Sequence, residues 1–288
     1  MRVCTPRGSF GAPSGIRTGV TRPLILVSND DGVEAAGLRA LRAALARFAD
    51  VVVVAPAREQ SAKSHALSLH HPLRHRIHPA DAAAGPIHSV DGTPADCVYV
   101  GLFREGLLPR RPDLCASGIN HGPNLGVDVH YSGTVAAARE AALRGIPAIA
   151  FSQIGGRPEV YRRSAELAAT LCERLLSASP PSEGTTPLLN VNFPAEAPVG
   201  VRTTRMGIRR YDEGVDVRVD PRGGEYVWIG GPGGVTHGEL EQSDTGAVDE
   251  GFVSVTPLRL DVTHPDHFGL AAFMAGPPEE ASQEDDSP

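Results

Sequence analysis

Five short apolar runs constrain the fold of this chain more than any other feature of its sequence. Each run is continuous rather than alternating, which indicates a strand buried on both faces of a sheet. Helical patterns separate several of them, and strand followed by helix is the repeating unit of a parallel sheet. The runs are LILVS (24–28), VVVVAP (51–56), DLCASG (113–118), PAIAFS (147–152) and LLNVNFP (188–194).

Three intervening segments carry the helical patterns. Residues 34–48 and 159–177 each place apolar residues at spacings of three and four, which puts them on one helix face. Residues 133–144 are rich in helix formers and are followed by glycine and proline, a typical helix stop. We therefore predict an α/β fold with a Rossmann-like, mostly parallel sheet, helices on both faces and right-handed crossovers.

The character of the chain changes from about residue 200, where Gly/Pro turns and β-rich pieces such as EYVWIG begin. We predict an α/β catalytic core over 23–200 and a β-rich extension over 201–268 that serves oligomerisation. Residues 1–22 are basic and lack an apolar stretch, so a secretory signal is disfavoured. We expect a disordered extension or a start site placed too early, with a targeting peptide as the alternative. Residues 269–288 are predicted to be an acidic disordered tail.

Composition excludes several partners. The formal net charge is -7 with no concentrated Lys/Arg run, so we expect no binding of long nucleic acid. No apolar stretch approaches the ~18 residues of a spanning helix, so we expect no membrane partner. The four cysteines lie far apart without a C-x-x-C pair, which favours a reducing cytoplasm over a disulfide framework or a zinc site.

Polar side chains follow three of the predicted strands. The sequence continues with NDDG after the first, REQSAKSHALSL after the second and INHGPNLG after the third. Carboxyl ends of parallel strands share the edge where open α/β sheets bind ligands. Two carboxylates, a hydroxyl and an amide oxygen there would suit Mg²⁺ or Mn²⁺ with room for phosphate oxygens.

A second cluster, YSGTVAAA at 131–138, predicts a helix N-terminus with two hydroxyls and free backbone N–H groups, which suits a phosphate. The sequence has no GxxxxGK[ST] loop, no GxGxxG after a strand and no GxSxG elbow. P-loop nucleotide hydrolysis, dinucleotide redox chemistry and α/β-hydrolase acyl transfer are therefore disfavoured.

Each polar feature also has a simpler structural explanation. One of the two aspartates would cap the helix that begins near Val33, and Ser61 would cap another. Asn120 would stabilise a turn, and the Ser-Gly-Thr would be an ordinary N-cap. Surface or packing roles are the simpler explanation for three histidines: His65, His121 and His130.

Taken together, these segments resemble the SurE family of survival proteins from about residue 23 to 265. The combination of SNDDG with SGIN-x-G-x-NLG and YSGTV is very specific. The matching segments are, in order, ILVSNDDGVEAAGLRAL, VVAPAREQSAKSHALSL, VDGTPADCVYVGL, PDLCASGINHGPNLGVDVHYSGTVAAAREAALRGIPAIAFS, LNVNFP and GFVSVTPLRLDVT.

The resemblance implies a divalent-metal-dependent phosphatase of nucleoside 5′- and 3′-monophosphates, with polyphosphate as a further substrate of some members. It implies one Mg²⁺ or Mn²⁺ ion per subunit and a homodimer or homotetramer. The metal ligands carry over as Asp30, Asp31, Ser61 and Asn120, and the two aspartates are also the catalytic candidates. The residues expected beside the substrate phosphate are Asn29, Ser132, Gly133 and Thr134.

Two departures and two rival interpretations remain. Ala57 stands where the family usually has an acid that is not a ligand, and Val127 stands where a glutamate is common.

A signalling receiver domain is a weak rival, because no later strand end offers its phosphorylatable aspartate. A nucleotide-binding module without turnover stays open, as does the choice between water attack and an aspartyl-phosphate. The leaving oxygen would take its proton from His65 or from solvent.

Overall fold

The computed structural model describes residues 22–79, 85–179, 185–230 and 234–276. The predicted N-terminal extension therefore lies outside the described residues except for Arg22, and so does the predicted tail from residue 277 on. No helix in the described ranges is long and apolar enough to cross a membrane.

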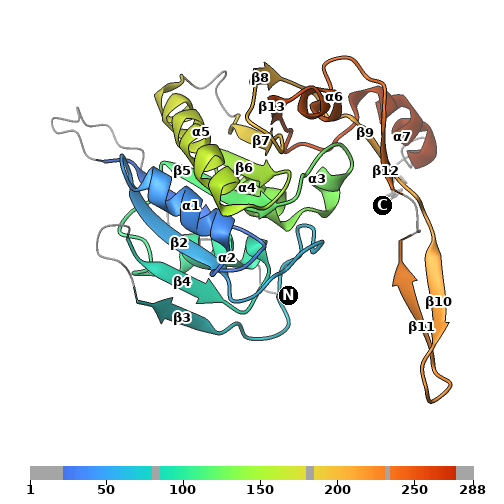
Figure 1. Ribbon diagram of the computed structural model, residues 1–288, viewed down its shortest axis with the longest axis horizontal. Coiled ribbons are helices and arrows are strands. Elements are labelled where there is room, and N and C mark those ends of the chain that lie inside the picture. Colours follow the sequence, from blue (N-terminus) through green and yellow to red (C-terminus); the bar gives the residue numbers. More distant parts are fainter. Residues whose placement is uncertain (1–21, 80–84, 180–184, 231–233, 277–288) are drawn as a thin grey trace, which may run out of the picture.

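A nine-stranded sheet forms the centre of the molecule (Figure 1). Six neighbouring strands, from β4 to β7 in the spatial order, are parallel, which confirms the mostly parallel sheet. At the ends, β3 is antiparallel to β4, β13 is antiparallel to β7, and β8 is parallel to β13. The spatial order is β3 (His75–His78), β4 (Ile87–Val90), β2 (Asp50–Pro56), β1 (Leu24–Ser28), β5 (Leu114–His121), β6 (Ala148–Gln153), β7 (Leu188–Phe193), β13 (Phe252–Pro257) and β8 (Gly200–Thr203).

Helices cover both faces of the sheet. Helices α1 (Ala36–Leu45) and α5 (Pro158–Ser177) pack on one face, and α2 (Pro94–Phe103) and α4 (Gly133–Leu143) pack on the other. Alternate residues of the central strands enter the two clusters, so that Ile25 belongs to the α1 side and Leu26 to the α2 side. This two-sided burial is the reason why the strands are apolar without alternation.

One crossover differs from our expectation. Helix α4 leads from β5 to β6 and helix α5 leads from β6 to β7, in the same direction across the sheet, yet the two helices lie on opposite faces. The connection through α5 therefore has the opposite hand to those through α1, α2 and α4. Crossovers are right-handed in almost all parallel sheets, and the prediction that all of them are right-handed is wrong here.

The C-terminal part differs from the expected division in two places. Strands β8 and β13 belong to the main sheet rather than to a separate extension, because β13 pairs with β7 over Ser254↔Asn192 and its neighbours. Helix α7 (Phe268–Ala275) occupies the start of the segment predicted to be a disordered tail, since its FGLAAFMA sequence is continuously apolar.

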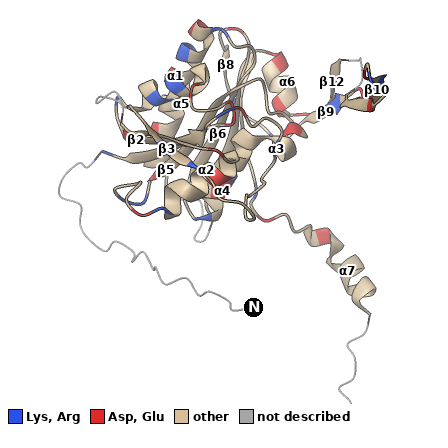
Figure 2. Ribbon diagram, turned by 90° about the horizontal axis from the view of Figure 1, so that it is seen from below, with Lys and Arg blue, Asp and Glu red and all other residues tan. Residues whose placement is uncertain are grey.

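The remaining elements stand at the periphery. Strands β10 and β11 form an antiparallel hairpin of exposed residues, and β9 pairs with β12 at its base. Figure 2 shows this hairpin and α7 lying apart from the body of the sheet. The bounds are α3 (Asp128–Tyr131), β9 (Ile208–Tyr211), β10 (Val215–Val219), β11 (Glu225–Ile229), β12 (Val235–Gly238), α6 (Asp244–Asp249) and η1 (Pro265–His267).

Candidate active site

The strand order reverses between β1 and β5, which lie side by side. The chain leaves β1 through α1 on one face and leaves β5 through α4 on the other, so a crevice opens at their carboxyl ends. The β5–β6 register shifts between Ser117 and Asn120, which turns the end of β5 into an irregular segment. The two aspartates after β1 and Asn120 on β5 thus meet at this switch point.

Asp30 is the most buried of the predicted ligands, with 4% of its surface exposed. Its carboxylate accepts a hydrogen bond from the Thr134 hydroxyl, and its backbone carbonyl accepts one from the Gln60 N–H at 2.7 Å. Burial raises the pKa of Asp30 to about 6, because the hydrogen bonds from Thr134 offset desolvation only in part and Asp31 adds negative charge.

The first residue of α4, Gly133, lies close to the Asp30 side chain. A Cβ atom added to Gly133 would lie 2.9 Å from the Cβ of Asp30 and 2.9 Å from Cγ of Pro94. Only glycine lets the helix approach so closely. The position of Gly133 in the sequence SGT therefore fixes how near the helix N-terminus comes to Asp30.

Asp31 is half-buried and reaches across to β5. Its Oδ2 accepts a hydrogen bond from the backbone N–H of His121 at 3.0 Å, and burial raises its pKa above the ordinary value. Helix α1 begins at Ala36 with Ala35 as N-cap and without any side-chain cap. Capping of this helix therefore does not explain the aspartate pair.

An open cleft of about 720 Å³ brings several predicted residues together. Asp30, Ser61, Asn120 and Ser132 line it, together with His121. The Ser61 hydroxyl donates to Glu59 at 2.7 Å, and the Asn120 amide donates to the Gly122 carbonyl at 2.9 Å. This volume is within the range of small-molecule sites.

The four predicted phosphate contacts are mostly engaged within the protein. Ser132 is the N-cap of α4, since its Oγ accepts from the Val135 N–H at 3.1 Å, so the simpler explanation applies to its hydroxyl. The Asn29 amide donates to the Gly32 carbonyl at 2.9 Å, and its buried Oδ1 has no partner among the described residues. The Thr134 hydroxyl donates a hydrogen bond to the Asp30 carboxylate, and Gly133 lies close to the Asp30 side chain. A phosphate role for these residues stays a prediction.

A buried amide network, which we did not predict from the sequence, lies beside the cleft. Asn124 donates its backbone N–H to Asn192 at 2.8 Å and its side-chain amide to Ser152 at 2.7 Å. Its carbonyl accepts from Asn190 at 2.8 Å. The repeated asparagines of LNVNFP were a usable signal, because polar side chains inside a buried strand require polar partners.

A further wall of the cleft comes from β9. Arg209 Nε lies 3.0 Å from Asp128 Oδ2, and the Tyr211 hydroxyl donates to the same carboxylate. All three residues line the cleft. No local pattern could have joined Asp128 to residues more than eighty positions away.

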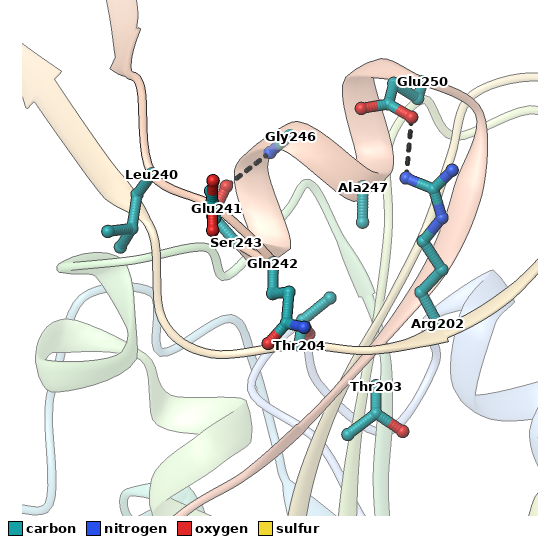
Figure 3. A pocket seen from close by; sticks show the side chains of 10 residues that line it. All are labelled: Arg202, Thr203, Thr204, Leu240, Glu241, Gln242, Ser243, Gly246, Ala247 and Glu250. Carbon is teal, nitrogen blue, oxygen red and sulfur yellow. Dashed lines mark hydrogen bonds and ion pairs between the residues drawn. The ribbon is translucent and has the colours of Figure 1, made fainter.

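Another pocket, of about 430 Å³, lies beside α6 (Figure 3). Arg202 pairs with Glu250 at 2.6 Å on its rim, and Ser243 caps α6 through the Gly246 N–H. None of the predicted site residues lines this pocket. The polar strand ends converge on the cleft at the switch point instead.

The fold and the cleft define a doubly wound α/β protein with a carboxylate pair at its topological switch point. Residues 25–213 match the family model of survival protein SurE. The chain belongs to the SurE family.

Known proteins align with most of this chain. It is 55% identical to the 5′-nucleotidase SurE of Sorangium cellulosum, covering 88% of this chain and 96% of that protein. It is 48% identical to the 5′-nucleotidase SurE of Deinococcus radiodurans, covering 93% and 97%. The crystal structure of the SurE protein from Aquifex aeolicus superposes with a TM-score of 0.73 at 38% identity, covering 88% of this chain and 100% of that one.

Proposed function

We propose that this protein is a 5′-nucleotidase, a phosphomonoesterase that releases phosphate from nucleoside 5′-monophosphates, and from 3′-monophosphates as well. One observation carries the proposal: two adjacent aspartates, one buried and one half-buried, stand at the switch point without an ion pair to any described residue. Neither Asp30 nor Asp31 forms an ion pair with any described residue. The names of the relatives support the choice of substrate.

The residues at the cleft fit a divalent cation. Carboxylate, hydroxyl and amide oxygens are the hard ligands of Mg²⁺ and Mn²⁺. The described residues contain no group of three or more His, Cys, Asp or Glu able to hold a metal, so a cation at this cleft needs hydroxyl or amide oxygens beside the two aspartates. We propose that one Mg²⁺ or Mn²⁺ per subunit is held by Asp30, Asp31, Ser61 and Asn120.

When bound, such a cation supplies Lewis-acid activation of the phosphoryl group and of a water molecule. The chain itself orients the reacting groups. Thr134 fixes the Asp30 carboxylate, and the His121 N–H fixes that of Asp31. One of the two aspartates would also accept the proton of an attacking water, and we propose Asp31 because it is the more exposed of the two. Direct attack by an aspartate is the competing route.

The test is phosphate release from a panel of nucleoside 5′- and 3′-monophosphates with Mn²⁺, Mg²⁺ or EDTA. We expect release with either cation and none with EDTA. Release that persists in EDTA would contradict the metal requirement alone. Folded protein that releases no phosphate from any substrate with either cation would contradict the phosphomonoesterase and favour the binding module without turnover.

We also propose that the protein forms a homodimer or homotetramer. The hairpin and α7 expose large apolar side chains, with Ile229 at 92% and Phe273 at 82%. Exposed apolar surface of this kind is typical of subunit interfaces. Light scattering coupled to size exclusion would measure the mass, and a monomer at micromolar concentration would contradict the proposal.

A cytoplasmic location is the last part of the proposal. Cys97, Cys115 and Cys172 are free and buried, as in proteins of a reducing compartment. Fractionation of the native host would test it, and enzyme found outside the cytoplasm would contradict it.

A further inference from the structure

Ser61 lies on a long connection between β2 and β3, residues 57–74, which we call the Ser61 loop. Two of its residues are left-handed although they are not glycine, Ala62 with φ 55° and Ser64 with φ 52°. Such conformations persist only where the surroundings hold them in place. The shape of the loop around Ser61 therefore depends on contacts from outside the loop.

Hydrogen bonds attach the loop to two helices. The Ser64 N–H donates to the Tyr131 carbonyl at 2.9 Å, and the Ser64 hydroxyl donates to the His130 carbonyl at 2.7 Å. Ser68 donates its N–H and its hydroxyl to the two oxygens of Asp96 at 2.8 and 2.7 Å. These contacts hold the loop against α3 and the first turn of α2.

A further attachment is a buried carboxylate on α4. Glu140 is 1% exposed, its Oε2 lies 2.8 Å from His65 Nε2, and its Oε1 accepts from Arg144 Nε at 2.9 Å. Burial alone would raise the pKa of Glu140, but the hydrogen bonds from His65 and Arg144 outweigh it and hold the pKa below its usual value. Removal of a partner would leave a buried charge poorly satisfied, which is costly.

Helix α4 thus contacts both sides of the cleft. Its first turn fixes Asp30 through Gly133 and Thr134, and Glu140 fixes the Ser61 loop two turns later through His65. Because one helix holds both, it contributes to the separation of Ser61 from Asp30, together with the direct hydrogen bond from the Gln60 N–H to the Asp30 carbonyl at 2.7 Å.

We infer that Glu140 is a positioning residue that acts through His65 to hold the Ser61 hydroxyl beside Asp30 in the cleft. The inference rests on the proposed function, which makes Ser61 a metal ligand. It also gives His65 a different role from proton donation. His65 does not line the cleft, and its Nε2 is already engaged by Glu140.

Three variants test the inference: Glu140→Gln, which removes the charge at nearly constant shape, His65→Ala, and Arg144→Gln as the matched control. Arg144→Gln breaks the other contact of the same carboxylate and leaves His65 in place. Two properties are measured on the full chain, the amide hydrogen exchange of residues 61–68 and the Mn²⁺ dissociation constant by calorimetry. Both are recorded well below the melting temperature of each variant.

We expect Glu140→Gln and His65→Ala to speed exchange in the loop and to weaken Mn²⁺ binding by about tenfold, as for other groups that orient metal ligands. Arg144→Gln should leave both within about twofold. In a Ser61→Ala background, Glu140→Gln should change the dissociation constant by less than about twofold, because the effect passes through Ser61.

Three results would overturn the inference: unchanged exchange and affinity in both His65→Ala and Glu140→Gln, equal effects from Arg144→Gln, or an undiminished effect in the Ser61→Ala background. If Glu140→Gln does not fold, His65→Ala still decides. If the wild-type protein binds no Mn²⁺, the metal site of the proposed function fails, and the exchange measurement alone decides whether Glu140 holds the loop.

Discussion

At the switch point between β1 and β5, polar side chains are buried among hydrogen bonds, whereas in the β10–β11 hairpin and α7 apolar side chains stand in solvent. Asp30 is almost fully buried and forms no ion pair with any residue in the described ranges. Phe268, Leu270 and Phe273 of α7 are all more than half exposed. One region buries most of a carboxylate away from water, and the other leaves apolar surface where water is abundant.

Both regions contain groups whose present surroundings are energetically unfavourable. A buried carboxylate is costly until a positive charge joins it. An exposed apolar helix is costly until another surface covers it. Each region of this SurE-family chain is therefore energetically incomplete in the folded monomer. We expect a divalent cation to complete the first and a second copy of the chain to complete the other.

The largest effect is expected for self-association through the exposed apolar side chains of α7. Leu270→Asp combined with Phe273→Asp on α7 should weaken self-association at least about 100-fold, because burial of each such side chain is worth about 1.5–3 kcal/mol. Light scattering across a concentration series measures the shift. Thr170→Asp combined with Ser177→Asp, both at exposed positions of α5, is the charge-matched control. An unchanged mass in the double variant would show that α7 is not at the interface.

The second-largest effect is expected for catalysis at the switch point. Gly133→Ala should lower phosphate release by about 100-fold, because the added Cβ displaces Asp30 or the start of α4 and small misplacements are costly in catalysis. Gly234→Ala is the control, since a Cβ there meets nothing within 4 Å. Steady-state rates of the two variants, both checked for folding by circular dichroism, decide the matter. Equal activity would mean that the close approach of α4 is dispensable.

The buried Asp30 charge should also lower the stability of the folded protein in a pH-dependent way. The pKa of Asp30 is raised to about 6, so the folded state binds this proton more tightly than the unfolded state does. Stability from this group is present below about pH 4 and is lost as pH rises through 6. In EDTA, Asp30→Asn should therefore be more stable than wild type by about 1–3 kcal/mol at pH 7.5 and nearly equal to it at pH 4.

Urea denaturation at the two pH values measures this difference. Wild-type protein should regain the lost stability on addition of Mn²⁺, and the variant should not. A variant that is less stable than wild type at pH 7.5 in EDTA would contradict the assigned cost of the Asp30 charge.

The smallest effect comes from the peripheral pocket. Glu250→Gln removes the ion pair with Arg202, in which both side chains are more than a third exposed. Exposed pairs contribute little, so stability should change by less than about 1 kcal/mol and phosphate release should not change. A loss of activity in this variant would connect the pocket beside α6 to catalysis, against our account.

The strands and helices that could be predicted are those with a clear local pattern of apolar residues. All five apolar runs are strands, and the three helical segments are helices. Helix α2 was missed although Thr93 and Asp96 form a capping box, because its sequence is apolar on nearly every side and shows no helical period. The opposite hand of the α5 crossover and the entry of β13 into the main sheet depend on packing between distant segments, which no local pattern records.

The site divides in the same way. Asp30, Asp31 and Asn120 could be placed because strand ends meet at one edge of a parallel sheet. Arg209 and Tyr211, which form a further wall of the cleft, come from a segment whose path over the sheet depends on tertiary contacts. Sequence could therefore locate the centre of the cleft and not its surroundings.

The most direct test of the central claim compares wild type with Asp30→Asn and Asp31→Asn. Phosphate release from a nucleoside 5′-monophosphate is measured with EDTA and then with excess Mn²⁺, alongside the Mn²⁺ dissociation constant. We predict activity in the wild type that EDTA abolishes and Mn²⁺ restores, and losses of more than about tenfold in rate and affinity in both variants. Folded Asp30→Asn protein that binds Mn²⁺ and turns over like wild type would contradict the claim.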